Sequence, residues 1–173
     1  MWSARLPPPA SRPLISLDSA GDRRPDSGRA PSETDRPART AGSSASGYVL
    51  DASALLALLF GEPGAEAVAD LIAEGAAVSA VNLSEVATVL VRRELDVDGI
   101  IEPLRQQVAV EAFTDADALC AASLHPADAQ LGLSLADRAC IALARRLGSN
   151  AATADQAWSA LNVGVEITMI RSR

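Results

Sequence analysis

The sequence contains no lysine, and all 15 of its basic residues are arginine. It has one histidine, His125, which excludes a histidine-rich zinc site. The two cysteines, Cys120 and Cys140, form no CxxC pair and lie in apolar, helix-like surroundings. This usage is typical of reduced core thiols in a cytoplasmic protein. No run approaches the ~20 apolar residues of a membrane-spanning helix, so no membrane location is expected.

The composition changes sharply near residue 47. Residues 1–46 are rich in proline, serine, arginine and glycine and show no apolar period, so we expect a disordered tail. The tail lacks the apolar h-region of a secretory signal, and a start codon assigned too far upstream, with the true start near Tyr48, is left open. Residues 47–173 form the expected folded domain, with eight arginines and 17 acids, a net charge of −9.

In this domain, short apolar runs alternate with amphipathic stretches. Such alternation predicts an α/β fold with a mainly parallel sheet covered by helices on both faces. The expected strands are 48–50, 77–80, 108–113, 151–153 and 165–170, and the expected helices are 53–60, 65–74, 83–95, 97–107, 115–123, 135–147 and 156–161.

Four acids lie where a parallel α/β fold gathers its site residues, beyond the carboxyl ends of the strands. Asp51 and Asp155 follow predicted strands, whereas Glu85 and Asp137 lie at predicted helix starts. Four clustered carboxylates repel one another, so a divalent cation is needed to neutralise them, and hard oxygen ligands suit Mg²⁺ or Mn²⁺. The pattern therefore indicates metal-dependent chemistry on a phosphate ester.

Each acid also has a structural interpretation. Asp51 and Asp155 can cap the helices that follow them. Glu85 and Asp137 stand three residues after Asn82 and Ser134, which is capping-box spacing. The alternative function is therefore a non-catalytic α/β interaction module whose acids only cap helices. Asp115 and Asp117 begin another predicted helix, and one of them could support the site from outside.

Two other α/β classes are excluded by single positions. A phosphatase with an aspartyl nucleophile of the haloacid dehalogenase type needs a second aspartate two residues on, where this chain has Ser53. A receiver domain needs a late lysine, and the chain has none.

Residues 47–173 resemble the PIN-domain ribonucleases, and specifically the VapC toxins of bacterial toxin–antitoxin pairs. No single motif decides this, but the set occurs in family order and with family-like intervals. The matching segments are residues 49–58 (VLDASALLAL), 62–64 (EPG), 82–86 (NLSEV), 133–140 (LSLADRAC), 142–144 (ALA) and 153–158 (TADQAW).

The resemblance implies a three-layer α/β/α sandwich with a five-stranded parallel sheet. It implies a metal-dependent endoribonuclease whose pocket is formed by Asp51, Glu85, Asp137 and Asp155, all present here. Ser53 and Thr153 are then expected near the pocket, as outer-shell or substrate-orienting groups. The implied partners are an RNA substrate, transfer RNA or another structured RNA, and a cognate antitoxin that blocks the pocket. A homodimer is also expected.

In the mechanism that follows, Asp51 is the central metal ligand, and Asp137 and Asp155 complete the site directly or through water. Glu85 binds the metal through water or orients the attacking water. The acidic domain is a poor match for a polyanion, so arginines are needed for phosphate contacts. With aromatic residues at 3%, recognition of a folded RNA by shape is favoured over base stacking. The candidate phosphate-binding arginines are Arg92, Arg93, Arg138, Arg145 and Arg146, although Arg145 and Arg146 could equally form a solvated helix end.

Overall fold

The structure is a computed structural model that describes residues 47–125 and 132–171. The tail predicted at residues 1–46, and with it the question of an upstream start, lies outside these residues. Within them, no helix has both the length and the apolar character needed to cross a lipid bilayer.

Five parallel strands form one sheet in the order β3-β2-β1-β4-β5. The first strand, β1, is central, and Val49 pairs with Ala77 on one side and Ala151 on the other. The predicted five-stranded parallel sheet is therefore confirmed, with shorter third and fifth strands than expected. The strands are β1 (Tyr48–Leu50), β2 (Ala76–Ser79), β3 (Ala109–Glu111), β4 (Asn150–Thr153) and β5 (Ile167–Met169).

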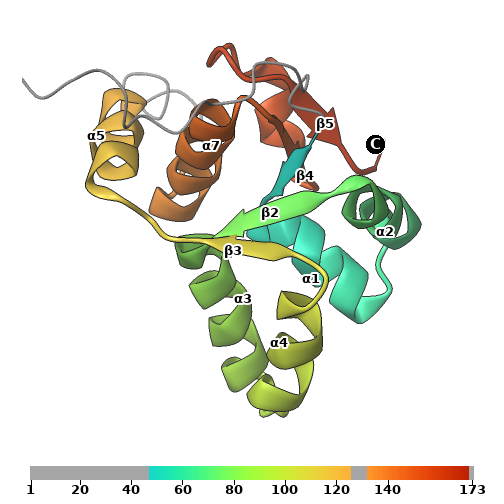
Figure 1. Ribbon diagram of the computed structural model, residues 1–173. Coiled ribbons are helices and arrows are strands. Elements are labelled where there is room, and N and C mark those ends of the chain that lie inside the picture. Colours follow the sequence, from blue (N-terminus) through green and yellow to red (C-terminus); the bar gives the residue numbers. More distant parts are fainter. Residues whose placement is uncertain (1–46, 126–131, 172–173) are drawn as a thin grey trace, which may run out of the picture. The chain divides into compact units, whose positions relative to one another are not determined.

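Helices cover both faces of this sheet, as the three-layer prediction requires. Successive strand residues point to opposite faces, so Leu50 packs in one apolar cluster and Val49 in the other. The Leu50 face is covered by α1 (Ala52–Phe60), α2 (Ala65–Glu74), α3 (Ala80–Arg92) and α4 (Val97–Arg105); the Val49 face is covered by α5 (Asp115–Ser123), α7 (Leu135–Leu147) and the 3₁₀ helix η1 (Gln156–Ala160) (Figure 1).

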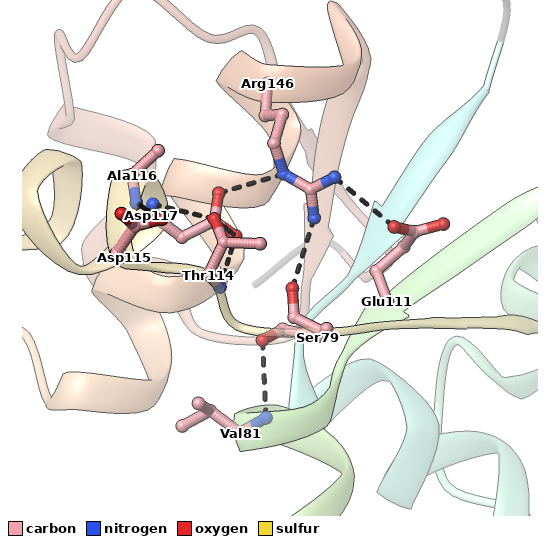
Figure 2. Close-up of polar contacts among 9 residues, drawn as sticks. Ser79, Val81, Glu111, Thr114, Asp115, Ala116, Asp117 and Arg146 are labelled. Carbon is pink, nitrogen blue, oxygen red and sulfur yellow. Dashed lines mark hydrogen bonds and ion pairs between the residues drawn. The ribbon is translucent and has the colours of Figure 1, made fainter.

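The start of α3 corrects one expectation. The sequence pattern placed the helix start at Leu83 with Asn82 as its cap, but the helix begins three residues earlier, at Ala80. Ser79 is the N-cap, and its hydroxyl accepts a hydrogen bond from the Val81 N–H at 3.3 Å (Figure 2). Asn82 thus lies inside the first turn, where its side chain is free to bond elsewhere.

Two glycines shape the connection between α1 and α2. Gly61 ends α1 in the left-handed region, with φ of 64°. Gly64 precedes α2 with φ of 99°, and a Cβ built there would approach the Ile170 carbonyl oxygen to 2.7 Å. Because Ile170 directly follows β5, the Gly64 backbone fits against the far edge of the sheet only without a side chain.

We expect Gly64→Ala to destabilise the protein more than Gly61→Ala. Both substitutions place alanine at positive φ, which costs roughly 1–2 kcal/mol. Only position 64 adds a steric clash, because nothing lies within 4 Å of a Cβ at position 61. Urea unfolding of both variants measures the difference, and equal losses would contradict a close approach at Gly64.

Candidate active site

The candidate site lies at the carboxyl end of the central strand. Strand order reverses on either side of β1, with β2 beside it on one side and β4 on the other. In open parallel sheets such a reversal leaves a crevice beyond the strand ends. Asp51 directly follows β1, and Asp155 follows β4 by two residues. Topology alone therefore brings these two acids to the same edge.

The Asp51 carboxylate is buried, with 3% of its surface exposed, and is held by hydrogen bonds. Its Oδ2 accepts from the Ser53 hydroxyl at 2.6 Å, the Thr153 hydroxyl at 3.1 Å and the Ser53 N–H at 3.2 Å. Its Oδ1 accepts from the Asn82 side-chain amide at 3.1 Å. These donors come from α1, β4 and α3, so the carboxylate lies where three elements meet.

The two hydroxyls link Asp51 to the backbone beyond β4. The Ala154 N–H donates to Ser53 Oγ at 3.0 Å, and the Asp155 N–H donates to Thr153 Oγ1 at 3.1 Å. A hydroxyl that accepts from a backbone amide still has its own proton to donate, and here that proton can go to Asp51. Ser53 and Thr153, expected near the pocket, thus contact its central acid directly.

Asp137 and Asp155 both take part in helix capping, Asp137 as the third residue of α7 and Asp155 as the N-cap of η1. The Ser134 N–H donates to Asp137 Oδ2 at 2.6 Å, and Ser134 Oγ accepts from the Asp137 N–H at 3.1 Å, which completes the expected capping box. Asp155 Oδ1 accepts from the Ala157 N–H at 2.9 Å. Burial raises the pKa of Asp137, the Ser134 hydrogen bonds partly oppose this, and repulsion from Asp51 and Asp155 adds to it.

Glu85 differs from the other three acids. Since α3 begins at Ala80, Glu85 lies in the second turn and the capping box expected with Asn82 does not form. Within the described residues its carboxylate has no hydrogen bond or ion pair. Burial raises the pKa of Glu85, and the charges of Asp51 and Asp137 raise it further.

The four acids line one pocket of about 270 Å³, together with Ala52, Ser53, Leu56 and Ser134. The lining has no basic side chain, and its carboxylate and hydroxyl oxygens are the donors that hard divalent cations prefer. Among the described residues, no three acids, histidines or cysteines are close enough to cage an ion by themselves. The lining thus fits a cation that keeps part of its water shell, as Mg²⁺ commonly does.

A second pocket of about 420 Å³ adjoins the first and shares Glu85 and Ser134 with it. It runs between α3 and the start of α7, and Arg92 lines its far part. Among the arginines in the described residues, Arg92 is the only one without a hydrogen bond, ion pair or ring contact. It is therefore the phosphate-binding candidate that the structure leaves available beside the acids.

Arg145 and Arg146 lie exposed in the last turn of α7, as a solvated helix end requires, and both guanidinium groups also have acceptors within the protein. The expectation that they contact phosphate stays a prediction. Arg145 donates twice to the Val163 carbonyl oxygen, at 2.6 and 2.9 Å. Arg146 donates to Asp117 at 3.0 Å, to Glu111 at 3.3 Å and to the Ala112 carbonyl oxygen at 3.2 Å (Figure 2). These guanidinium groups join α7 to neighbouring segments.

Two further candidates also have structural partners. Arg93 lies over the Phe60 ring, 4.0 Å from its centroid. Asp117, considered as an outer support of the site, forms a capping box with Thr114 and pairs with Arg146. Burial alone would raise the pKa of Asp117, but the hydrogen bonds from Thr114 and Arg146 outweigh it and lower the pKa.

The sequence profile of the PIN domain family matches residues 48–163, which is more than half of the chain. The chain belongs to the PIN domain family. No curated protein sequence matches it significantly.

Solved structures of VapC-type proteins share the fold. A toxin–antitoxin complex from Klebsiella pneumoniae matches with a TM-score of 0.57 and 15% identity, over 73% of this chain and 99% of that one. VapBC2 from Rickettsia felis, bound to a DNA fragment from its promoter, matches with a TM-score of 0.57 and 12% identity, over 70% of this chain and 97% of that one. VapC20 from Mycobacterium tuberculosis, a toxin that cleaves the sarcin–ricin loop, matches with a TM-score of 0.55 and 25% identity, over 65% of this chain and 93% of that one. The predicted resemblance to PIN-domain proteins of the VapC type is confirmed. Family and fold together support a nuclease of the toxin type.

The raised pKa of Asp137 predicts how stability depends on pH without metal. A carboxyl with a raised folded pKa is protonated more readily in the folded state, so its contribution is most favourable at low pH and is lost as pH rises through the folded value. Asp137→Asn removes this loss. In EDTA, the free energy of unfolding of the variant relative to wild type should therefore increase from about pH 3.5 to about pH 6.

Asp117→Asn is the matched control, because the lowered pKa of Asp117 gives the opposite sign. Its contribution is present above the unfolded pKa and is lost as pH falls. Relative to wild type, this variant should become less stable as pH rises towards the unfolded value of about 4, and the difference should then stay constant up to about pH 6. Urea titrations at several pH values test both, and parallel trends in the two variants would contradict the assignment.

Proposed function

We propose that the chain is a metal-dependent endoribonuclease and the toxin of a type II toxin–antitoxin pair. The observation that carries the proposal is Glu85. It caps no helix, yet it lines the same pocket as Asp51, Asp137 and Asp155. Its side chain is partly exposed, and partial desolvation together with the charges of Asp51 and Asp137 raises its pKa. Carboxylates that face one another repel, whereas a bound cation compensates for that repulsion. Family membership and the likeness to VapC-type toxins support the same conclusion.

The interaction module accounts for three acids but not for the fourth. Asp51, Asp137 and Asp155 cap α1, α7 and η1, so capping alone would explain them. It does not explain why Glu85 faces the same pocket, or why that pocket lacks a basic side chain. The nuclease proposal explains both, since the missing positive charge comes with Mg²⁺ or Mn²⁺.

In the proposed reaction Asp51, Asp137 and Asp155 hold the cation, directly or through water. Once bound, that cation neutralises charge on the phosphate and eases deprotonation of the attacking water. Glu85 orients this water, and its raised pKa suits a group that accepts a proton. Ser53 and Thr153 keep the Asp51 carboxylate in place through their hydrogen bonds to Oδ2.

The proposed substrate is a folded RNA, transfer RNA or another structured RNA, cleaved in the cytoplasm. The proposed protein partners are a cognate antitoxin that blocks the pocket and a second copy of the chain. Support for the antitoxin comes from neighbours solved as toxin–antitoxin and VapBC complexes.

Purified full-length protein should cut total or transfer RNA into discrete fragments with Mg²⁺ or Mn²⁺ and not with EDTA. Removing a residue that only supports a metal ligand typically lowers activity by ~10–100-fold. Asp51→Asn changes the proposed ligand itself, so it should lower the cleavage rate by more than that. Gel analysis of the fragments measures both effects. Asp98→Asn, an exposed acid in the first turn of α4, is the control and should keep the wild-type rate.

Metal-independent cleavage, or cleavage equal in Asp51→Asn and wild type, would contradict the proposed site. Circular dichroism of Asp51→Asn must show a folded protein for the comparison to count. If neither cleavage nor calorimetric binding of Mn²⁺ is detected in wild type, the interaction module is the better function.

We expect Arg92→Gln to weaken RNA binding and Arg105→Gln to leave it unchanged. Arg92 lines the groove beside Glu85, whereas Arg105 pairs with Glu102 at an exposed position on α4. Loss of one phosphate contact should reduce the slope of log affinity against log salt by about 1. Fluorescence anisotropy with catalytically inactive Asp51→Asn as background measures it, and equal slopes would contradict a contact at Arg92.

A further inference from the structure

The two oxygens of Asp51 are not equivalent. Oδ2 accepts three hydrogen bonds, from the Ser53 hydroxyl, the Ser53 N–H and the Thr153 hydroxyl. Oδ1 accepts one, from the Asn82 amide. A carboxylate oxygen has about two lone-pair sites, so Oδ2 is saturated by the protein. Oδ1 is the oxygen with acceptor capacity left for a cation.

Asn82 is fully buried and makes an unusual set of contacts. Its Nδ2 donates to Asp51 Oδ1 and to the Ala136 carbonyl oxygen, both at 3.1 Å. Both partners are acceptors only, so the amide nitrogen must face them, and the orientation of the side chain is determined. Within the described residues, Asn82 Oδ1 is buried without a hydrogen-bond partner.

An unpartnered buried oxygen is unfavourable, because the group loses its hydrogen bonds to water and gains none in return. An apolar side chain of similar shape at this position would avoid that loss. What Asn82 provides instead is its pair of donations. One reaches the central acid of the pocket, and the other reaches the peptide that directly precedes Asp137.

We infer that Asn82 is a positioning residue for the metal site, which holds Asp51 and the start of α7 at a fixed separation. It thereby sets Asp137 relative to Asp51 and leaves Asp51 Oδ1 as the oxygen that binds the cation. This inference rests on the proposed function. Supporting groups of this kind orient carboxylate ligands, and their removal typically weakens metal binding without removing a ligand.

The test is calorimetric titration of the full chain with Mn²⁺ alone, together with urea unfolding in EDTA. Asn82→Leu removes both donations with little change in volume. We expect it to weaken Mn²⁺ affinity by about 10–100-fold. If this variant does not fold, Asn82→Ala removes the same donors without added branching, and the same loss is expected of it.

Ser79→Ala is the matched control. It removes the N-cap of the same helix but touches neither Asp51 nor Ala136. We expect it to lower the urea midpoint at least as much as Asn82→Leu does, with Mn²⁺ affinity within about two-fold of wild type, well under the loss expected for a supporting group.

Wild-type Mn²⁺ affinity in the Asn82 variant would overturn the inference and leave the proposed function intact. An equal loss of affinity in Ser79→Ala would also overturn it, because loosening of α3 would then be the cause. Absence of Mn²⁺ binding in wild type would instead overturn the proposed metal site, and the inference with it.

Discussion

The buried carboxylate of Asp51 is the constraint on which the rest of the site depends. A charge removed from water must be compensated by hydrogen bonds or by another charge, and here the protein provides only hydrogen bonds. They come from the start of α1, the end of β4 and the first turn of α3. The sheet order β2-β1-β4 lets these three elements meet. Each of these elements contributes a pocket acid or a hydrogen-bond donor to Asp51. The hydrogen bonds that compensate the charge of Asp51 therefore also bring the walls of the pocket together.

Capping and metal binding are compatible at this site because both use the N-terminal ends of helices. Backbone N–H groups and the helix dipole favour a negative charge there, so Asp137 and Asp155 are partly satisfied before any cation binds. Desolvation, together with the remaining repulsion from neighbouring acids, raises the pKa of Glu85 and of Asp137. Local instability of this kind is characteristic of functional sites, where folding and function make different demands on the same residues.

The elements and the four acids could be predicted because the signals for them are local: apolar periodicity, and an acid placed after a strand or at a helix start. The contacts of Asn82 could not be predicted from the sequence. Both SAVN and NLSE resemble helix starts, and the choice between them depends on contacts with Asp51 and Ala136, which are distant in the chain. The acceptors of Arg145 and Arg146 could not be predicted either, since Val163 and Asp117 become neighbours of these arginines only in the fold.

The charge of the domain also bears on how it would select RNA. Residues 47–173 carry a net charge of −9, and in the described residues every arginine except Arg92 is already engaged within the protein. Non-specific affinity for nucleic acid comes mainly from basic side chains that neutralise phosphates. A generic RNA strand would therefore gain little from this surface. If the proposed function holds, a substrate that presents one phosphate to the acidic pocket and another to Arg92 would gain more, and discrimination would rest on RNA shape rather than on attraction to charge.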